Sequence, residues 1–164
     1  MTYAIVYSSQ TGNTKLLADT IREELPKEDC LYFGLPSELA LDADRIYVGF
    51  WTDKGVCNAD TISFLKHVTT QEIYLFGTAG FGQTPEYFDK VLQKTEKHLP
   101  KSAKLIGAFM CQGKMPLSVR TRYEKLMHSP VPVPNLKAMI ENFDQAFSHP
   151  NEHDLNSLKE GIIK

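Results

Sequence analysis

The 164-residue sequence predicts an α/β fold: an open, doubly wound parallel sheet of five strands with helices on both faces. Five short apolar runs are bounded by turn residues, which is typical of strands buried on both faces. Segments with helical spacing alternate with these runs, and such βαβ units give parallel strands with right-handed crossovers. The usual strand order of the five-stranded version is 2-1-3-4-5, with its ligand site outside the carboxyl ends of strands 1 and 3.

The five predicted strands are rich in β-branched and aromatic residues, which favour extended structure. Serines follow the first strand, and a Gly-Leu-Pro turn follows the second. The strands are Tyr3–Tyr7, Cys30–Phe33, Arg45–Phe50, Glu72–Phe76 and Ala103–Met110.

Helix signals lie between these strands. The first predicted helix, 14–25, has Leu17, Ile21 and Leu25 at intervals of four residues, which places them on one helical face, and Pro26 stops it. Thr84, Pro85 and Glu86 give the third helix a hydroxyl cap, a proline at its first position and an acid facing its dipole. Further helices are predicted over 61–68, 116–127 and 135–147.

The C-terminal third is expected to end the same domain. Residues 129–134 contain three prolines and predict an extended linker. In the helix after this linker, the apolar side chains are expected to form the inward face: Leu136, Met139, Ile140, Phe143 and Phe147. We therefore expect one domain over 1–149, with 150–164 forming a C-terminal tail or a short surface helix.

Composition excludes several classes of protein. Hydrophobic residues make up 42% of the chain and charged residues 23%, as in ordinary soluble globular proteins. Cys30, Cys57 and Cys111 form no CxxC pair, which argues against a zinc site, a thioredoxin-type dithiol and a secreted disulfide scaffold. With no signal-peptide pattern and no long apolar run, the sequence predicts a cytoplasmic protein that makes no contact with membranes.

The charge distribution suggests one docking surface. A net charge of −2 indicates no bulk attraction for nucleic acid or membrane. Residues 1–50 carry four basic and eight acidic side chains, whereas 101–164 carry nine basic and six acidic ones. Within the basic region, Lys114, Arg120, Arg122 and Lys125 either form a docking surface for an acidic partner or are ordinary solvated charges.

The loop between the first strand and the first helix is the strongest candidate site. It carries several hydroxyl side chains and Gly12 at a helix N-terminus, where unpaired N–H groups and the helix dipole favour a phosphate. Lys15 is the only cation close in sequence. An ordinary strand-to-helix connection remains the alternative, because the same residue types favour helix starts. Walker and GxGxxG motifs are absent, so nucleotide binding through them is unsupported.

The run Ser9-Gln10-Thr11-Gly12-Asn13-Thr14 resembles the flavodoxin signature Ser/Thr-x-Thr-Gly-x-Thr. In that family the signature wraps the phosphate of FMN. The match holds at every specified position and lies directly after the first strand. The resemblance therefore implies that these six residues bind the FMN phosphate.

The loop after the third strand is similar to the second flavin loop of the family. The resemblance implies cofactor contacts from Trp51, Thr52, Asp53, Lys54 and Gly55. The ring of Trp51, the only tryptophan, is expected to stack on the flavin, which contributes about 1 kcal/mol beyond burial. A peptide between residues 52 and 55 is expected to flip on reduction, which glycine makes sterically easy. The alternative is that the Trp51 ring only closes the end of the sheet.

The loop after the fourth strand is similar to the third flavin loop. The resemblance implies contacts from Thr78, Ala79, Gly80, Phe81 and Gly82. Phe81 is the first candidate for covering the outer face of the flavin, and Tyr87 is a weaker one. A glycine-rich loop without a ligand is the alternative.

The resemblance to short-chain flavodoxins covers about residues 2–110 and the final helix. It implies a low-potential FMN protein that shuttles single electrons between a reductase and a redox enzyme, as a monomer with no catalytic residue and no metal site. Two alternatives stay open: an FMN-dependent NAD(P)H:quinone-type oxidoreductase, and a flavin-free binding module. The chain departs from the family pattern because it is not strongly acidic and carries the basic segment 114–125.

Overall fold

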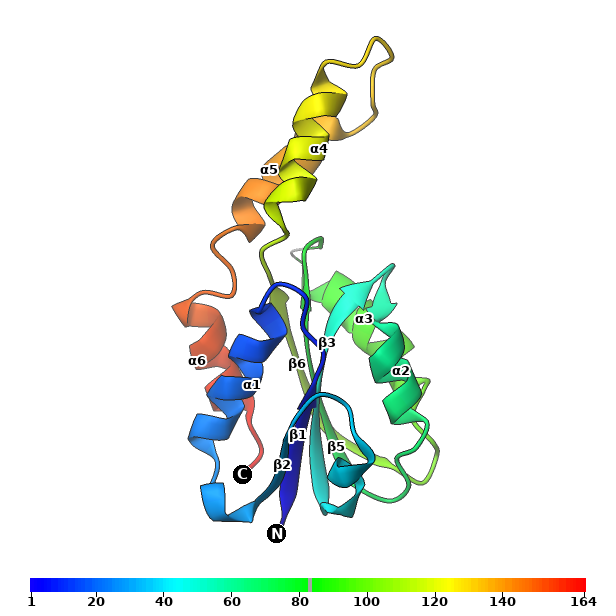
Figure 1. Cartoon of the computed structure of the whole chain (residues 1–164), viewed down its shortest axis with the longest axis vertical. Helices are drawn as coiled ribbons and strands as arrows, with labels where there is room; N and C mark the ends of the chain where they lie inside the picture. Colours follow the sequence, from blue (N-terminus) through cyan, green and yellow to red (C-terminus); the bar gives the residue numbers. More distant parts are fainter. Residues whose placement is uncertain (83) are drawn as a thin grey trace.

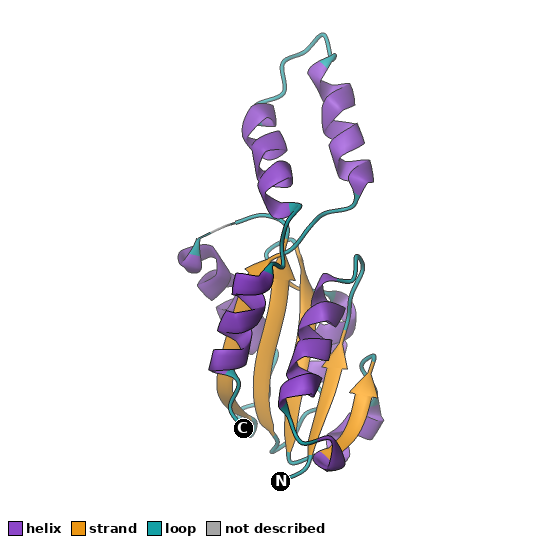
Figure 2. Ribbon diagram, turned by 90° about the vertical axis from the view of Figure 1, so that its left-hand side faces the viewer, coloured by secondary structure: helices purple, strands orange, loops and turns teal. Residues whose placement is uncertain are grey.

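The computed structural model describes residues 1–82 and 84–164 and confirms the expected parallel sheet (Figure 2). Its strand order is β2-β1-β3-β5-β6. A short strand that was not predicted, β4, pairs antiparallel with the end of β3. The strands are β1 (Tyr3–Tyr7), β2 (Cys30–Gly34), β3 (Arg45–Asp53), β4 (Val56–Cys57), β5 (Glu72–Ala79) and β6 (Lys104–Gln112).

Helices cover both faces of the sheet (Figure 1). Helices α1 (Asn13–Glu24) and α6 (Glu152–Gly161) lie on one face, and α2 (Ala59–Leu65) and α3 (Pro85–Glu96) lie on the other. Two short 3₁₀ helices, Lys27–Asp29 and Glu38–Asp42, flank β2. Each face has its own apolar core; members are Ile5, Leu17, Ile21, Phe76 and Leu158 on the first face, and Val48, Phe50, Leu65, Leu75 and Val91 on the second.

The segment 150–164 forms helix α6, which packs against α1 and the sheet. Asn151 and Asp154 make a reciprocal capping box at its start. Leu158 is fully buried and Ile162 nearly so, because their spacing places them on one inward face. This helix occupies the position beside the sheet that the sequence assigned to 135–147. Among the described residues, no helix is long and apolar enough to cross a membrane.

Residues 117–146 form a helical hairpin that projects from the carboxyl ends of the strands (Figure 1). Helices α4 (Leu117–Met127) and α5 (Leu136–Ala146) pack against each other, with the rings of Tyr123 and Phe143 buried between them. Phe147 stays 52% exposed, so the expected inward packing of this last apolar residue is wrong. The apolar stripe of α5 is covered by α4 rather than by the sheet.

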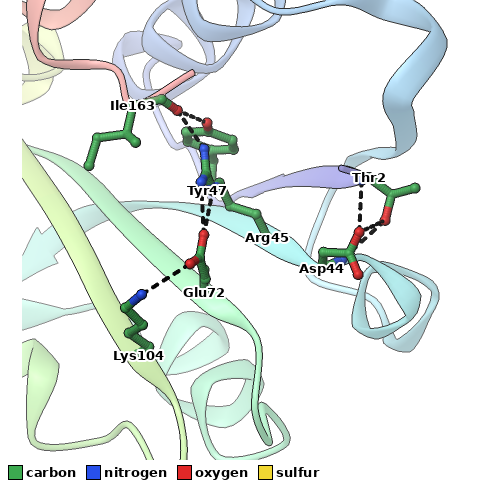
Figure 3. Close-up of polar contacts among 7 residues, drawn as sticks. All are labelled: Thr2, Asp44, Arg45, Tyr47, Glu72, Lys104 and Ile163. Atoms are coloured by element: carbon green, nitrogen blue, oxygen red, sulfur yellow. Dashed lines mark hydrogen bonds and ion pairs between the residues drawn. The ribbon is translucent and has the colours of Figure 1, made fainter.

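A polar cluster at the opposite end of the sheet fixes the C-terminus (Figure 3). Arg45 Nη2 donates to Glu72 Oε2 at 2.8 Å, and Lys104 Nζ lies 3.3 Å from Glu72 Oε1. Arg45 Nη1 and Tyr47 Oη each donate to the carbonyl oxygen of Ile163 at 2.7 Å. Strands β3, β5 and β6 and the chain end after α6 are therefore held together by charge-assisted hydrogen bonds.

Glu72 should make the fold sensitive to acid. The hydrogen bonds from Arg45 and then from Lys104 lower its pKa below the ordinary 4.5. Since the folded pKa is the lower one, Glu72 stabilises the fold above about pH 4.5, and this contribution is lost as the pH falls further. Glu72→Gln should therefore lose less in melting temperature between about pH 5 and pH 3 than the wild type, as measured by circular dichroism. If the melting temperatures of the two proteins fell equally over this pH range, Glu72 would not be the source of the acid sensitivity.

Candidate functional site

The three loops singled out by the sequence meet at the carboxyl end of the sheet. They surround a hollow of about 190 Å³, here called the central hollow. Of the sixteen predicted contact residues, it is lined by Ser9, Gln10, Thr11, Asn13, Thr14, Trp51, Thr52, Thr78, Gly80 and Phe81. The strand order produces this meeting, because β1, β3 and β5 are adjacent and all end at this edge.

The first loop has the conformation of an anion-binding helix start. Gly12 caps α1 with φ +85°, a left-handed conformation that glycine adopts without strain. Ser9 Oγ accepts hydrogen bonds from the N–H of Gly12 at 3.1 Å and of Lys15 at 3.4 Å. Ser9 Oγ thus caps two of the four N–H groups that helix geometry leaves without an internal partner. Among the described residues, the N–H groups of Asn13 and Thr14 and the Ser9 hydroxyl hydrogen remain available to a ligand.

Thr14 connects the three loops. Its buried hydroxyl donates to the carbonyl of Phe50 at 3.2 Å and lies 3.2 Å from Thr78 Oγ1. Thr52 Oγ1 in turn donates to the carbonyl of Thr78 at 2.8 Å. The Thr14 side chain therefore holds the strand ends in register, and its hydroxyl hydrogen is already used inside the protein.

The second loop is a β-hairpin. Strand β3 continues to Asp53, and Lys54 and Gly55 both have positive φ, as a two-residue type I′ turn requires. Trp51 and Thr52 line the central hollow, but Lys54 and Gly55 do not. A Cβ at Gly55 would lie 3.7 Å from Lys94 Nζ, so the turn leans toward α3.

Cys57 follows this turn on β4. Its N–H donates to Thr95 Oγ1 on α3, and its side chain is 1% exposed. Burial raises the pKa of the Cys57 thiol to about 11, so the thiol stays protonated at neutral pH.

The third loop presents Phe81 at the central hollow. Its side chain is 44% exposed, whereas Tyr87 packs against Gly82 and the core. Ala79 is buried beneath the loop. Of the two candidates for covering a ligand, only Phe81 borders the central hollow.

A fourth segment, Gly113–Pro116, completes the wall of the central hollow and was not predicted. It follows β6 and leads into the helical hairpin. Asn13 Nδ2 donates to the carbonyl of Lys114 at 2.8 Å, and Thr11 Oγ1 donates to the same oxygen at 3.3 Å. The Met115 side chain packs so closely on Gly80 that a Cβ there would lie 2.6 Å from Met115 Cγ. The sequence feature that could have identified this segment is its position directly after the last parallel strand, which places it at the same edge of the sheet as the other loops.

A larger hollow of about 640 Å³ adjoins the central hollow, shares Trp51 as a lining residue and is here called the lateral hollow. The first loop, the turn after β2 and helix α2 line it, together with Asp53. Ser8 Oγ is buried here and has no hydrogen-bond partner among the described residues. Trp51 lines both hollows, as do Ser9 and Gln10.

The four basic residues suggested as a docking surface separate into three environments. Lys114 lies at the base of the hairpin beside the first loop. Arg120 on α4 is paired with Asp144 and, at 3.2 Å, with Glu124. Arg122 and Lys125 are exposed on the same helix. The structure leaves the last two as the accessible positive charges of α4.

Known proteins share this fold. A flavodoxin-like domain-containing protein BilS from Clostridium symbiosum (strain WAL-14163) is 39% identical over 180 aligned positions, covering 99% of this chain and 95% of that protein. The structure of two-electron reduced Megasphaera elsdenii flavodoxin aligns with a TM-score of 0.53 at 21% identity, over 87% of this chain and 98% of that one.

A Lactobacillus acidophilus flavoprotein, solved in complex with FMN, aligns with a TM-score of 0.52 at 16% identity, over 66% of this chain and 92% of that one. The flavodoxin domain family matches residues 4–163, which includes the helical hairpin and α6. This chain therefore belongs to the flavodoxin domain family.

Proposed function

We propose that this chain binds FMN at the central hollow and passes single electrons between a reductase and a redox enzyme. One observation carries the proposal: an anion-binding helix start and two partly exposed aromatic rings, Trp51 and Phe81, border the same hollow. The loop 9–14 would hold the phosphate, and the rings would hold the flavin. FMN supplies the redox chemistry, and the protein supplies binding and orientation.

The central hollow has to widen before it can hold FMN. Pockets for ligands of this size enclose roughly 300–1,000 Å³. The central hollow is smaller than that, at about 190 Å³. Trp51 is half-buried and also lines the lateral hollow of about 640 Å³. A shift of its ring toward the lateral hollow would widen the central one.

The movement of Trp51 gives a direct test of cofactor binding. Because Trp51 is the only tryptophan, its emission reports on this site alone. Titration of flavin-free protein with FMN should quench the tryptophan emission in a saturable way. A protein that ignores FMN, with unchanged emission and no flavin retained on gel filtration, would contradict the proposed function.

Two measurements on the loaded protein address electron carriage. Stepwise reduction followed by absorbance should show two separate one-electron stages. NAD(P)H oxidation by the protein alone should be slow and should rise when a reductase is added. Rapid turnover without any partner would instead make the protein a self-sufficient oxidoreductase.

The partner that we propose is a redox protein with an acidic surface. Arg122 and Lys125 are three positions apart on α4, so they share one exposed face of the helix. The hairpin begins at the wall of the central hollow, which would bring a protein bound to α4 close to the flavin. Exposed charges of this kind mainly raise the association rate.

A further inference from the structure

Lys15, the cation closest in sequence to the first loop, already forms an ion pair within α1. Lys15 Nζ lies 2.7 Å from Asp19 Oδ2, one turn further along α1. This hydrogen bond raises the pKa of Lys15 and keeps it charged, but the pair is neutral in sum. An anion held by the first loop therefore gains little from Lys15.

Lys114 is held beside the same loop by its backbone. Its carbonyl accepts hydrogen bonds from Asn13 and Thr11, and its N–H donates to the carbonyl of His149 at 2.9 Å. Both backbone groups are thus fixed, so the side chain starts from a defined place. The residue lines the central hollow and also a hollow of about 400 Å³ over the N-terminus of α1.

The Lys114 side chain is exposed and forms no ion pair with any acid among residues 1–82 and 84–164. It is therefore an uncommitted cation that borders an anion-binding helix start. A helix N-terminus supplies only about half a unit of positive charge. A phosphate dianion in the loop would leave most of its charge unmatched without a further cation.

We propose that Lys114 supplies the cation for the FMN phosphate, which makes 113–116 a fourth cofactor-binding segment beside the three flavin loops. This inference rests on the proposed function. The ammonium group is well suited to this role, because lysine binds phosphate as a mobile point charge. The side chains of Asn13 and Thr11 act in positioning, since they hold the Lys114 carbonyl, while the backbone of the loop would face the phosphate.

The test compares FMN with riboflavin, which has the same ring system and no phosphate. Lys114→Gln should weaken FMN binding by about ten- to a hundredfold, as expected for a lost charge-assisted contact. Riboflavin binding should stay unchanged, which would also show that the variant is folded. Lys137→Gln on α5 removes the same charge away from the site and should leave both affinities unchanged.

Salt and a conservative variant complete the design. FMN binding by the wild type should weaken as salt is added, because screening reduces the attraction. The salt dependence should be smaller in Lys114→Gln and restored in Lys114→Arg. Wild-type FMN affinity in Lys114→Gln, or an equal loss for riboflavin, would overturn the proposal. If the wild type bound neither flavin, the proposed function itself would fail.

Discussion

Gly77→Val is expected to destabilise the fold by about 3 kcal/mol, a large part of the 5–15 kcal/mol typical of a whole domain. Gly77 lies on β5 directly beside Phe50 on β3. A Cβ at Gly77 would lie 2.5 Å from the fully buried Phe50 ring, so the ring or the backbone would have to shift. Urea unfolding should show a lower midpoint with an unchanged slope.

Two further variants make this prediction specific. Gly161→Ala places its methyl at 3.4 Å from Tyr74 Oη, an ordinary contact for a residue at the end of α6. It should change stability by less than about 1 kcal/mol, because alanine favours helices over glycine. Adding Phe50→Leu to Gly77→Val should recover part of the loss, because the two sites are in contact. Additive losses in the double variant would show that the ring is not the cause.

The paired glycines and phenylalanines also position the candidate site. Gly49 faces Phe76 and Phe50 faces Gly77 across the same two strands, so a ring covers a glycine on each side of the sheet. Trp51 and Thr78 follow one residue later and are register partners. Tight packing below them therefore fixes where the second and third loops leave the sheet.

The sequence predicted the parts of the fold whose signals are local. Apolar runs located all five parallel strands, and the usual order of a five-stranded doubly wound sheet proved to be the right one. The three loops could be placed at one edge because parallel strands direct their carboxyl ends to the same side. Strand β4 escaped prediction because two residues carry no periodic pattern.

The exchange of roles between α5 and α6 could not be predicted from local pattern. Both helices are amphipathic, and a stripe of apolar residues does not identify the surface that covers it. The α5 stripe is covered by α4, whereas α6 buries Leu158 and Ile162 against the sheet. The approach of Lys114 to Asn13 spans 101 positions of sequence and depends on the whole sheet being formed.

Trp51→Ala is expected to weaken binding of FMN and riboflavin alike, by about ten- to a hundredfold, because stacking of a flat ring on an aromatic side chain contributes roughly 1–3 kcal/mol. Quenching of the flavin's own fluorescence measures both affinities. Trp51→Phe keeps a ring on the same strand and should bind both flavins within a few-fold of the wild type. Stability should change little in either variant, because Trp51 is only half-buried.

The two ligand-directed variants together divide the site into two parts. Loss of the Trp51 ring should remove the stacking contact proposed for the flavin ring, which FMN and riboflavin share, so the phosphate should make no difference to the effect. Loss of the Lys114 charge should act on FMN alone. If Trp51→Ala bound both flavins as the wild type does, Trp51 would only close the end of the sheet, and the flavin would have to lie against Phe81 and the segment 113–116.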